Sequence, residues 1–122
     1  TVMTVMGRGA ESVRAYTAGV NDFATVIWAD GRVANLKLDP KNWDYGGFAF
    51  PEHGKPFGLC GPKGYEPMLK DAILPFFRTG AVPVPHEETL EIFAIMDAAA
   101  KSHAEGGREV KLSEITGDSP AF

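Results

Sequence analysis

The order of structural elements is decided by residues 65–115, which read YEPMLKDAILPFFRTG (65–80), AVPVP (81–85), HEETLEIFAIMDAAAKSHAEGG (86–107) and REVKLSEI (108–115). Apolar residues recur at steps of three and four in the first segment, which predicts a helix ending at Gly80 and kinked by Pro75. The third segment predicts a second helix from near Pro85 to Gly106. Its apolar stripe consists of Leu90, Phe93, Ala94, Ala98 and Ala99, widened by Ile92, Ile95 and Met96. Alternation over 109–112 predicts a last strand.

Strands are expected in the first half, most clearly at 23–29 (FATVIWA) and 32–38 around Asp30-Gly31. Asp-Gly is typical of a two-residue type I′ turn, which pairs Ala29 with Arg32. This register predicts an apolar sheet face beneath the helices. Its residues are Phe23, Thr25, Ile27, Ala34, Leu36 and Leu38. The opposite face, with Trp28 and Val33, is then expected to contact a partner subunit, another domain or a substrate.

These elements together predict an α+β fold, an open and mainly antiparallel sheet with two helices packed on one face. We expect a single domain over residues 1–115 and a flexible tail over residues 116–122. At 122 residues the chain is long enough to bury a core without disulfides, and its one cysteine allows no internal disulfide.

Charge and hydropathy exclude two classes of partner. The net charge is −4 and the lysines are scattered, so no nucleic-acid partner is expected. No apolar run approaches the roughly 18 residues of a membrane span, so no membrane partner is expected. No signal peptide is visible, which favours a cytoplasmic protein.

Few residues suggest chemistry. There is no GxGxxG for a nucleotide, no histidine pair at metal-ligand spacing and no nucleophile with a nearby base, so we predict no catalytic, cofactor-binding or metal-binding residue. Glu87, Glu88 and Glu91 are interpreted as charges of a helix start and its solvated face. The loop Trp43-Asp44-Tyr45 offers aromatic rings beside a carboxylate. It suits either a polyol ligand or packing against another domain.

Residues 64–115 resemble the C-terminal end of the Gfo/Idh/MocA oxidoreductases, the family of glucose–fructose oxidoreductase and inositol dehydrogenase. The resemblance lies in FF-x-TG at 76–80, VPVP at 82–85, EETLEIFA-x-M-x-AA at 87–99, GG at 106–107 and V-x-L at 110–112. Upstream, MGRGAESVRAY (6–16) and WADGRVANLKL (28–38) are similar to the same family. Pro75 departs from the family pattern before the FF pair.

The resemblance implies a parent enzyme with an N-terminal Rossmann domain for NAD or NADP, which this chain lacks. It also implies a sheet domain that shapes a sugar or polyol site and mediates homo-oligomer assembly through its open face. The family's E-K-P lysine and catalytic histidine precede the matched region, so no catalytic residue is carried over. We therefore expect a substrate-shaping and oligomerisation domain without activity of its own. The alternative is a free-standing α+β ligand-binding or assembly module with no nicotinamide chemistry.

Overall fold

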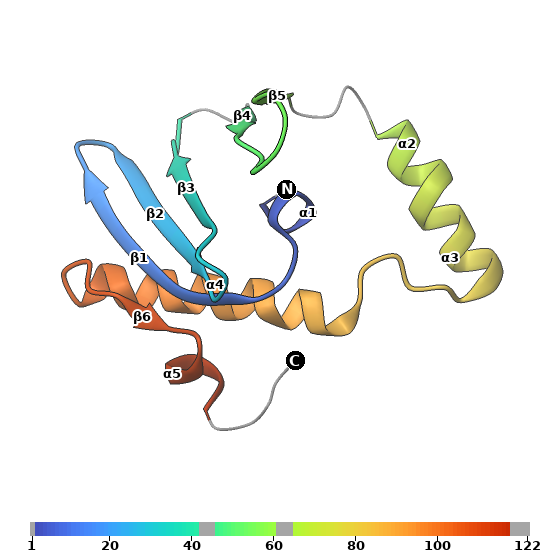
Figure 1. Ribbon diagram of the computed structural model, residues 1–122. Coiled ribbons are helices and arrows are strands. Elements are labelled where there is room, and N and C mark those ends of the chain that lie inside the picture. Colours follow the sequence, from blue (N-terminus) through green and yellow to red (C-terminus); the bar gives the residue numbers. More distant parts are fainter. Residues whose placement is uncertain (1, 42–45, 61–64, 118–122) are drawn as a thin grey trace. The chain divides into compact units, whose positions relative to one another are not determined.

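The computed structural model describes residues 2–41, 46–60 and 65–117. It confirms the α+β fold class, with an open four-stranded antiparallel sheet and a separate two-stranded sheet (Figure 1). The strands are β1 (Ala10–Ala18), β2 (Asn21–Trp28), β3 (Val33–Leu38), β4 (Gly46–Ala49), β5 (Phe57–Cys60) and β6 (Val110–Lys111). The helices are α1 (Val2–Met6), α2 (Glu66–Met68), α3 (Leu74–Thr79), α4 (His86–Ala104) and α5 (Ser113–Thr116), and a π-helical turn, η1 (Leu69–Ile73), joins α2 to α3.

Contacts divide the chain into two compact units. Unit 1 combines Thr1–Asn42 with His86–Phe122, and unit 2 is Trp43–Pro85. The predicted packing of the 65–80 helix on the same sheet face as α4 stays a prediction, because that helix belongs to unit 2.

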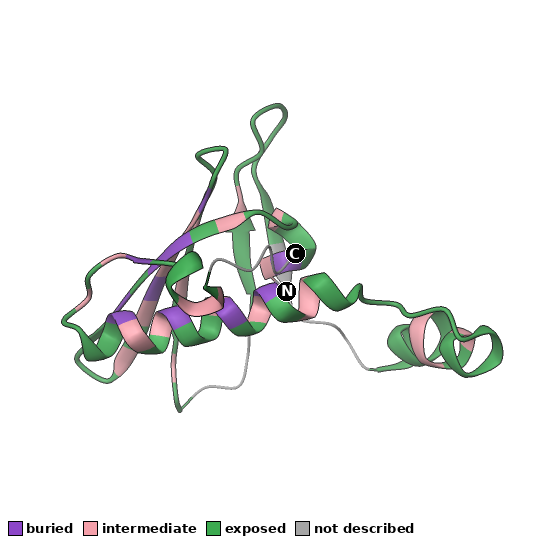
Figure 2. Cartoon of the chain, turned by 90° about the horizontal axis from the view of Figure 1, so that it is seen from below, coloured by how far each residue is buried: buried purple, intermediate pink, exposed green. Residues whose placement is uncertain are grey.

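Unit 1 is a sheet of strand order β3-β2-β1-β6 with α4 packed along it (Figures 1 and 2). Its core combines residues from both ends of the described chain. The buried cluster consists of Met3, Val13, Val26, Trp28, Ala94, Ala98, Val110 and Leu112. Since β6 pairs with β1 rather than with a neighbour in sequence, the C-terminal segment completes the sheet that the first half of the chain begins.

The β2–β3 turn differs from the prediction by one residue. Val26 pairs with Ala34, and Trp28 N–H donates to Arg32 O at 2.9 Å, so the loop is Ala29-Asp30-Gly31. Gly31 N–H donates to Trp28 O at 2.9 Å, and Gly31 has a φ of +88°. Three-residue hairpin loops usually end in a residue with a left-handed backbone conformation, and Gly31 takes this position here.

This shift reverses which side chains share a face, because successive side chains of a strand point to opposite sides. Val26 and Trp28 now lie on the core side, with Ala34 and Leu36 packed against the core. Phe23, Thr25 and Ile27 lie on the other side, where they are only half-buried. The predicted face beneath the helices was therefore wrong for β2, although it was right for Ala34 and Leu36.

The buried face of α4 matches the predicted stripe at Ala94 and Ala98 but differs from it elsewhere. Its fully buried residues are Glu91, Ala94, Ala98 and Ser102. By contrast, Phe93 is 58% exposed and Met96 59% exposed. Small side chains and the Glu91 carboxylate therefore face the sheet, and Ile92 and Ile95 pack against the edge of the core. Phe93 and Met96 lie on the exposed part of the helix.

Unit 2 contains the β4–β5 hairpin and the α2–η1–α3 helix. Phe48 pairs with Gly58 and Ala49 with Phe57, close to the strands predicted around the PEHGKP turn. The helix contains a π-helical turn just before Pro75, with Leu74 N–H bonded to Leu69 O. This wider turn lies where Pro75, which has no N–H, interrupts the α-helical pattern. The helix ends at Gly80 in the left-handed conformation, as predicted.

The described chain ends with α5, which begins at Ser113, where a turn was predicted. Thr116 closes this short helix, and its hydroxyl donates to Leu112 O at 3.2 Å. Of the predicted tail at 116–122, Thr116 belongs to α5 and residues 118–122 lie outside the described residues, so the tail stays a prediction.

Candidate functional site

The candidate site is the sheet surface opposite α4, here called the open face. It consists of Arg14, Tyr16, Phe23, Thr25, Ile27, Val33, Asn35 and Lys37, which alternate with the core residues along β1, β2 and β3. Val33 is 49% exposed and Tyr16 51% exposed. The long helix α4 packs against the sheet on the side opposite the open face (Figure 2).

An aromatic pair and a polar row give the open face its chemistry. Tyr16 and Phe23 are direct cross-strand partners, and their rings stack with centroids 5.5 Å apart and planes inclined by 16°. In the next row the Thr25 hydroxyl donates to Asn35 Oδ1 at 2.8 Å. Apolar rings beside hydrogen-bonding side chains suit contact with another protein surface, since both parts find partners there.

Glu109 supplies a negative charge at one side of the open face. Its carboxylate accepts a hydrogen bond from the Ser12 hydroxyl at 2.7 Å and one from Arg14 Nη2 at 3.0 Å. The Ser12 hydrogen bond, followed by that of Arg14, holds the pKa of the Glu109 carboxyl below its ordinary value. The Arg14–Glu109 pair is therefore charged near neutral pH and exposed to a partner.

The predicted contact residues do not form one group in the structure. Trp28 is only 1% exposed, and its indole N–H donates to Gly7 O at 3.0 Å. It belongs to the core, which corrects its assignment to a contact surface. Val33 lies on the open face, and its role in contact stays a prediction. Trp43, Asp44 and Tyr45 lie outside the described residues.

Glu91 has a structural role that the sequence analysis did not predict. Its side chain is buried, not solvated, and Oε1 accepts hydrogen bonds from Gly9 N and Ala10 N, both at 2.8 Å. Arg8 Nε lies 3.4 Å from Oε2. Gly7 and Gly9 have φ of +70° and +104°, a backbone conformation that presents successive N–H groups to an anion. The glycine segment therefore binds a carboxylate of its own chain.

Ser102 makes a second connection of the same kind. Its hydroxyl oxygen accepts a hydrogen bond from Ala15 N at 2.8 Å. Along α4, Glu91 and Ser102 are separated by a rise of about 16 Å. Along β1, Ala10 and Ala15 are separated by a similar distance, about 16 Å. The two side chains thus hold the helix parallel to the strand at two points.

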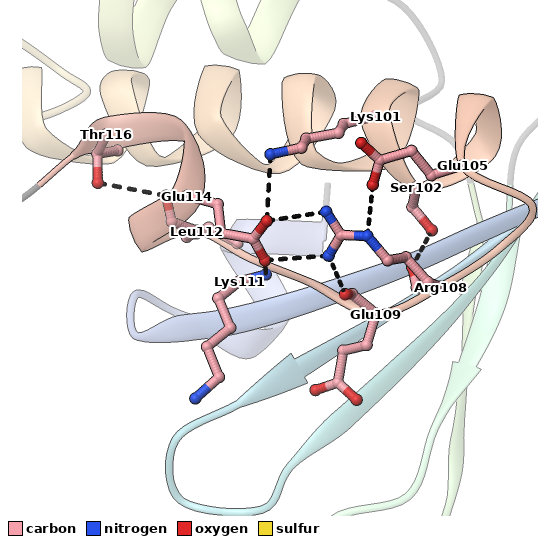
Figure 3. Close-up of polar contacts among 9 residues, drawn as sticks. All are labelled: Lys101, Ser102, Glu105, Arg108, Glu109, Lys111, Leu112, Glu114 and Thr116. Carbon is pink, nitrogen blue, oxygen red and sulfur yellow. Dashed lines mark hydrogen bonds and ion pairs between the residues drawn. The ribbon is translucent and has the colours of Figure 1, made fainter.

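An ionic cluster joins the end of α4 to α5 (Figure 3). Glu114 receives Arg108 Nη2 at 2.9 Å, Lys101 Nζ at 3.1 Å and the Lys111 backbone N–H at 3.1 Å. Arg108 also pairs with Glu105. The Arg108 hydrogen bond, the Lys111 N–H and Lys101 lower the pKa of Glu114 to about 2. These contacts hold α5 in place. Within this cluster Lys101 and Arg108 are each paired with a carboxylate.

A further polar contact joins Thr17, Asp22 and His103. The Thr17 hydroxyl donates to Asp22 Oδ1 at 2.5 Å and lies 2.7 Å from His103 Nε2. Because Thr17 has one proton and donates it to Asp22, its oxygen accepts from His103, which does not then act as its base. Over residues 2–41, 46–60 and 65–117, no three His, Cys, Asp or Glu side chains gather as metal ligands.

Unit 2 has an open apolar groove of about 360 Å³. It is lined by Ile73, Phe76, Phe77, Val82, Pro83 and Val84. Such a lining can pack against apolar groups but contains no side chain able to transfer a proton. None of residues 46–58 and 65–85 is buried, so this unit has little core of its own in the described residues.

Comparison with protein-family models, with curated proteins and with solved structures finds no match for this chain. None of the helices in the described part of the chain has the length and apolar character of a membrane span.

Proposed function

We propose that this chain is the C-terminal, substrate-shaping and oligomerisation domain of an NAD(P)-dependent sugar or polyol oxidoreductase of the Gfo/Idh/MocA type. The nicotinamide and the catalytic residues belong to the parent enzyme, and this chain has no activity of its own. The missing Rossmann domain is one partner, and a second copy of the chain, bound through the open face, is the other.

One contact carries the proposal. The stretch 87–99 is the most specific part of the resemblance, and 6–16 is a second similar stretch far from it in sequence. Glu91, inside the EETLEIFA motif, binds the backbone of Gly9 and Ala10, inside the MGRGAESVRAY motif. A contact between the two motifs gives a physical reason for them to occur together in one sheet domain. The contact places both motifs in one folded unit, as a shared sheet domain requires.

The open face supports the assembly part of the proposal. The three strands that carry the open face, β1, β2 and β3, are nine, eight and six residues long and present on the order of 400 Å² in projection, from a strand spacing of about 4.8 Å and a rise of about 3.3 Å per residue. A stable interface uses about 800 Å² of accessible surface on each partner. The accessible surface of the side chains is larger than this flat projection. The area of the open face is therefore of the order needed for one side of a dimer interface.

The parentage is tested by the coding DNA immediately upstream of Thr1. We expect an in-frame GxGxxG on a strand–helix turn, followed by E-K-P. The parent enzyme, assayed with a panel of sugars and polyols, should then reduce NAD or NADP. A start codon at or just before Thr1 would instead favour the free-standing binding or assembly module.

Assembly is tested with two matched valine variants. Val33 lies on the open face, and Val20, which is 63% exposed, lies in the β1–β2 turn outside it. Val33→Lys should convert the oligomer to monomer by light scattering after size exclusion, whereas Val20→Lys should leave the mass unchanged. If wild type is a monomer at all concentrations, or both variants keep its mass, assembly through this face is wrong.

A further inference from the structure

We draw no further inference here: the strongest candidate, the exposed apolar ridge of α4 formed by Leu90, Phe93 and Met96, is a surface for which nothing in the structure shows what covers it.

Discussion

Replacing Glu91 should loosen the contact between α4 and the start of β1. Its carboxylate binds two backbone N–H groups at 2.8 Å, and hydrogen bonds to a charged group contribute about 1.5–3 kcal/mol each. Gly9 is exposed, so water can replace part of what its N–H loses. We therefore expect Glu91→Ala to lower the free energy of unfolding by about 2–4 kcal/mol.

Glu91→Gln separates charge from geometry. A glutamine retains one carbonyl oxygen at the position of Oε1 but is neutral, and neutral hydrogen bonds are about half as strong as charge-assisted ones. The expected loss is about 1–2 kcal/mol. Glu87→Ala is the matched control, because Glu87 is an exposed carboxylate in the first turn of the same helix and its loss should cost under about 1 kcal/mol.

The assay is urea unfolding followed by far-ultraviolet circular dichroism, with amide hydrogen exchange as a site-specific readout. Exchange at Gly9 and Ala10 should accelerate in Glu91→Ala and remain unchanged in Glu87→Ala. The reasoning is refuted if Glu91→Ala costs less than about 0.5 kcal/mol, the range of ordinary surface substitutions. Equal losses in Glu91→Ala and Glu87→Ala would also refute it.

Three further predictions concern the sheet and the C-terminal cluster. Val26→Ala should cost about 2 kcal/mol in chemical denaturation, whereas Val33→Ala should cost under about 0.5 kcal/mol; equal costs would contradict the faces described above. Gly31→Ala should cost about 1–2 kcal/mol because of the φ of +88°, and an unchanged unfolding midpoint would mean that the turn has another geometry. Glu114 has a pKa lowered from 4.5 to about 2, so its stabilising effect is complete above about pH 4.5 and is lost as pH falls toward 2. Unfolding midpoints measured over this range should fall more in wild type than in Glu114→Gln, and parallel curves would count against the cluster.

The fold class could be predicted because the strongest signals are local. The α4 helix begins after Pro85 and the chain turns at Gly106-Gly107, whose φ values are positive. Gly80 likewise ends α3 in the left-handed conformation. These residues determine backbone conformation without help from distant parts of the chain, so their sequence positions are sufficient evidence.

The β2–β3 register could not be obtained in the same way. Asp30-Gly31 is compatible with both loop lengths. In the structure Asp30 binds the Arg32 backbone N–H at 3.1 Å and its side-chain Nε at 2.7 Å. Trp28 packs in the core with its indole bonded to Gly7, a contact across the fold. Tertiary packing therefore selects the longer loop, and propensity alone does not distinguish the two.

The buried face of α4 was predicted only in part, correctly for Ala94 and Ala98 but not for Glu91 and Ser102. Hydrophobicity favours Phe93, yet the helix approaches the sheet with Ala94, Ala98 and Ser102. Glu91 tolerates burial because the N–H groups of Gly9 and Ala10 bind Oε1 and Arg8 pairs with Oε2. Glu91 lies three residues before Ala94, and the sequence has glycines at 7 and 9. These two features together could have indicated a buried carboxylate.

The arrangement of unit 1 has a consequence for synthesis on the ribosome. The strand β1 lies between β2 and β6, and β6 comes from Val110–Lys111. The β1–β2–β3 hairpins can form early, but their apolar side has no cover until α4 and β6 have emerged, and long-range pairing of this kind is slow. During that interval Val26 and Trp28 are exposed on a sheet without its helix. A nascent chain paused between β3 and α4 is therefore the form of this protein most in need of a chaperone.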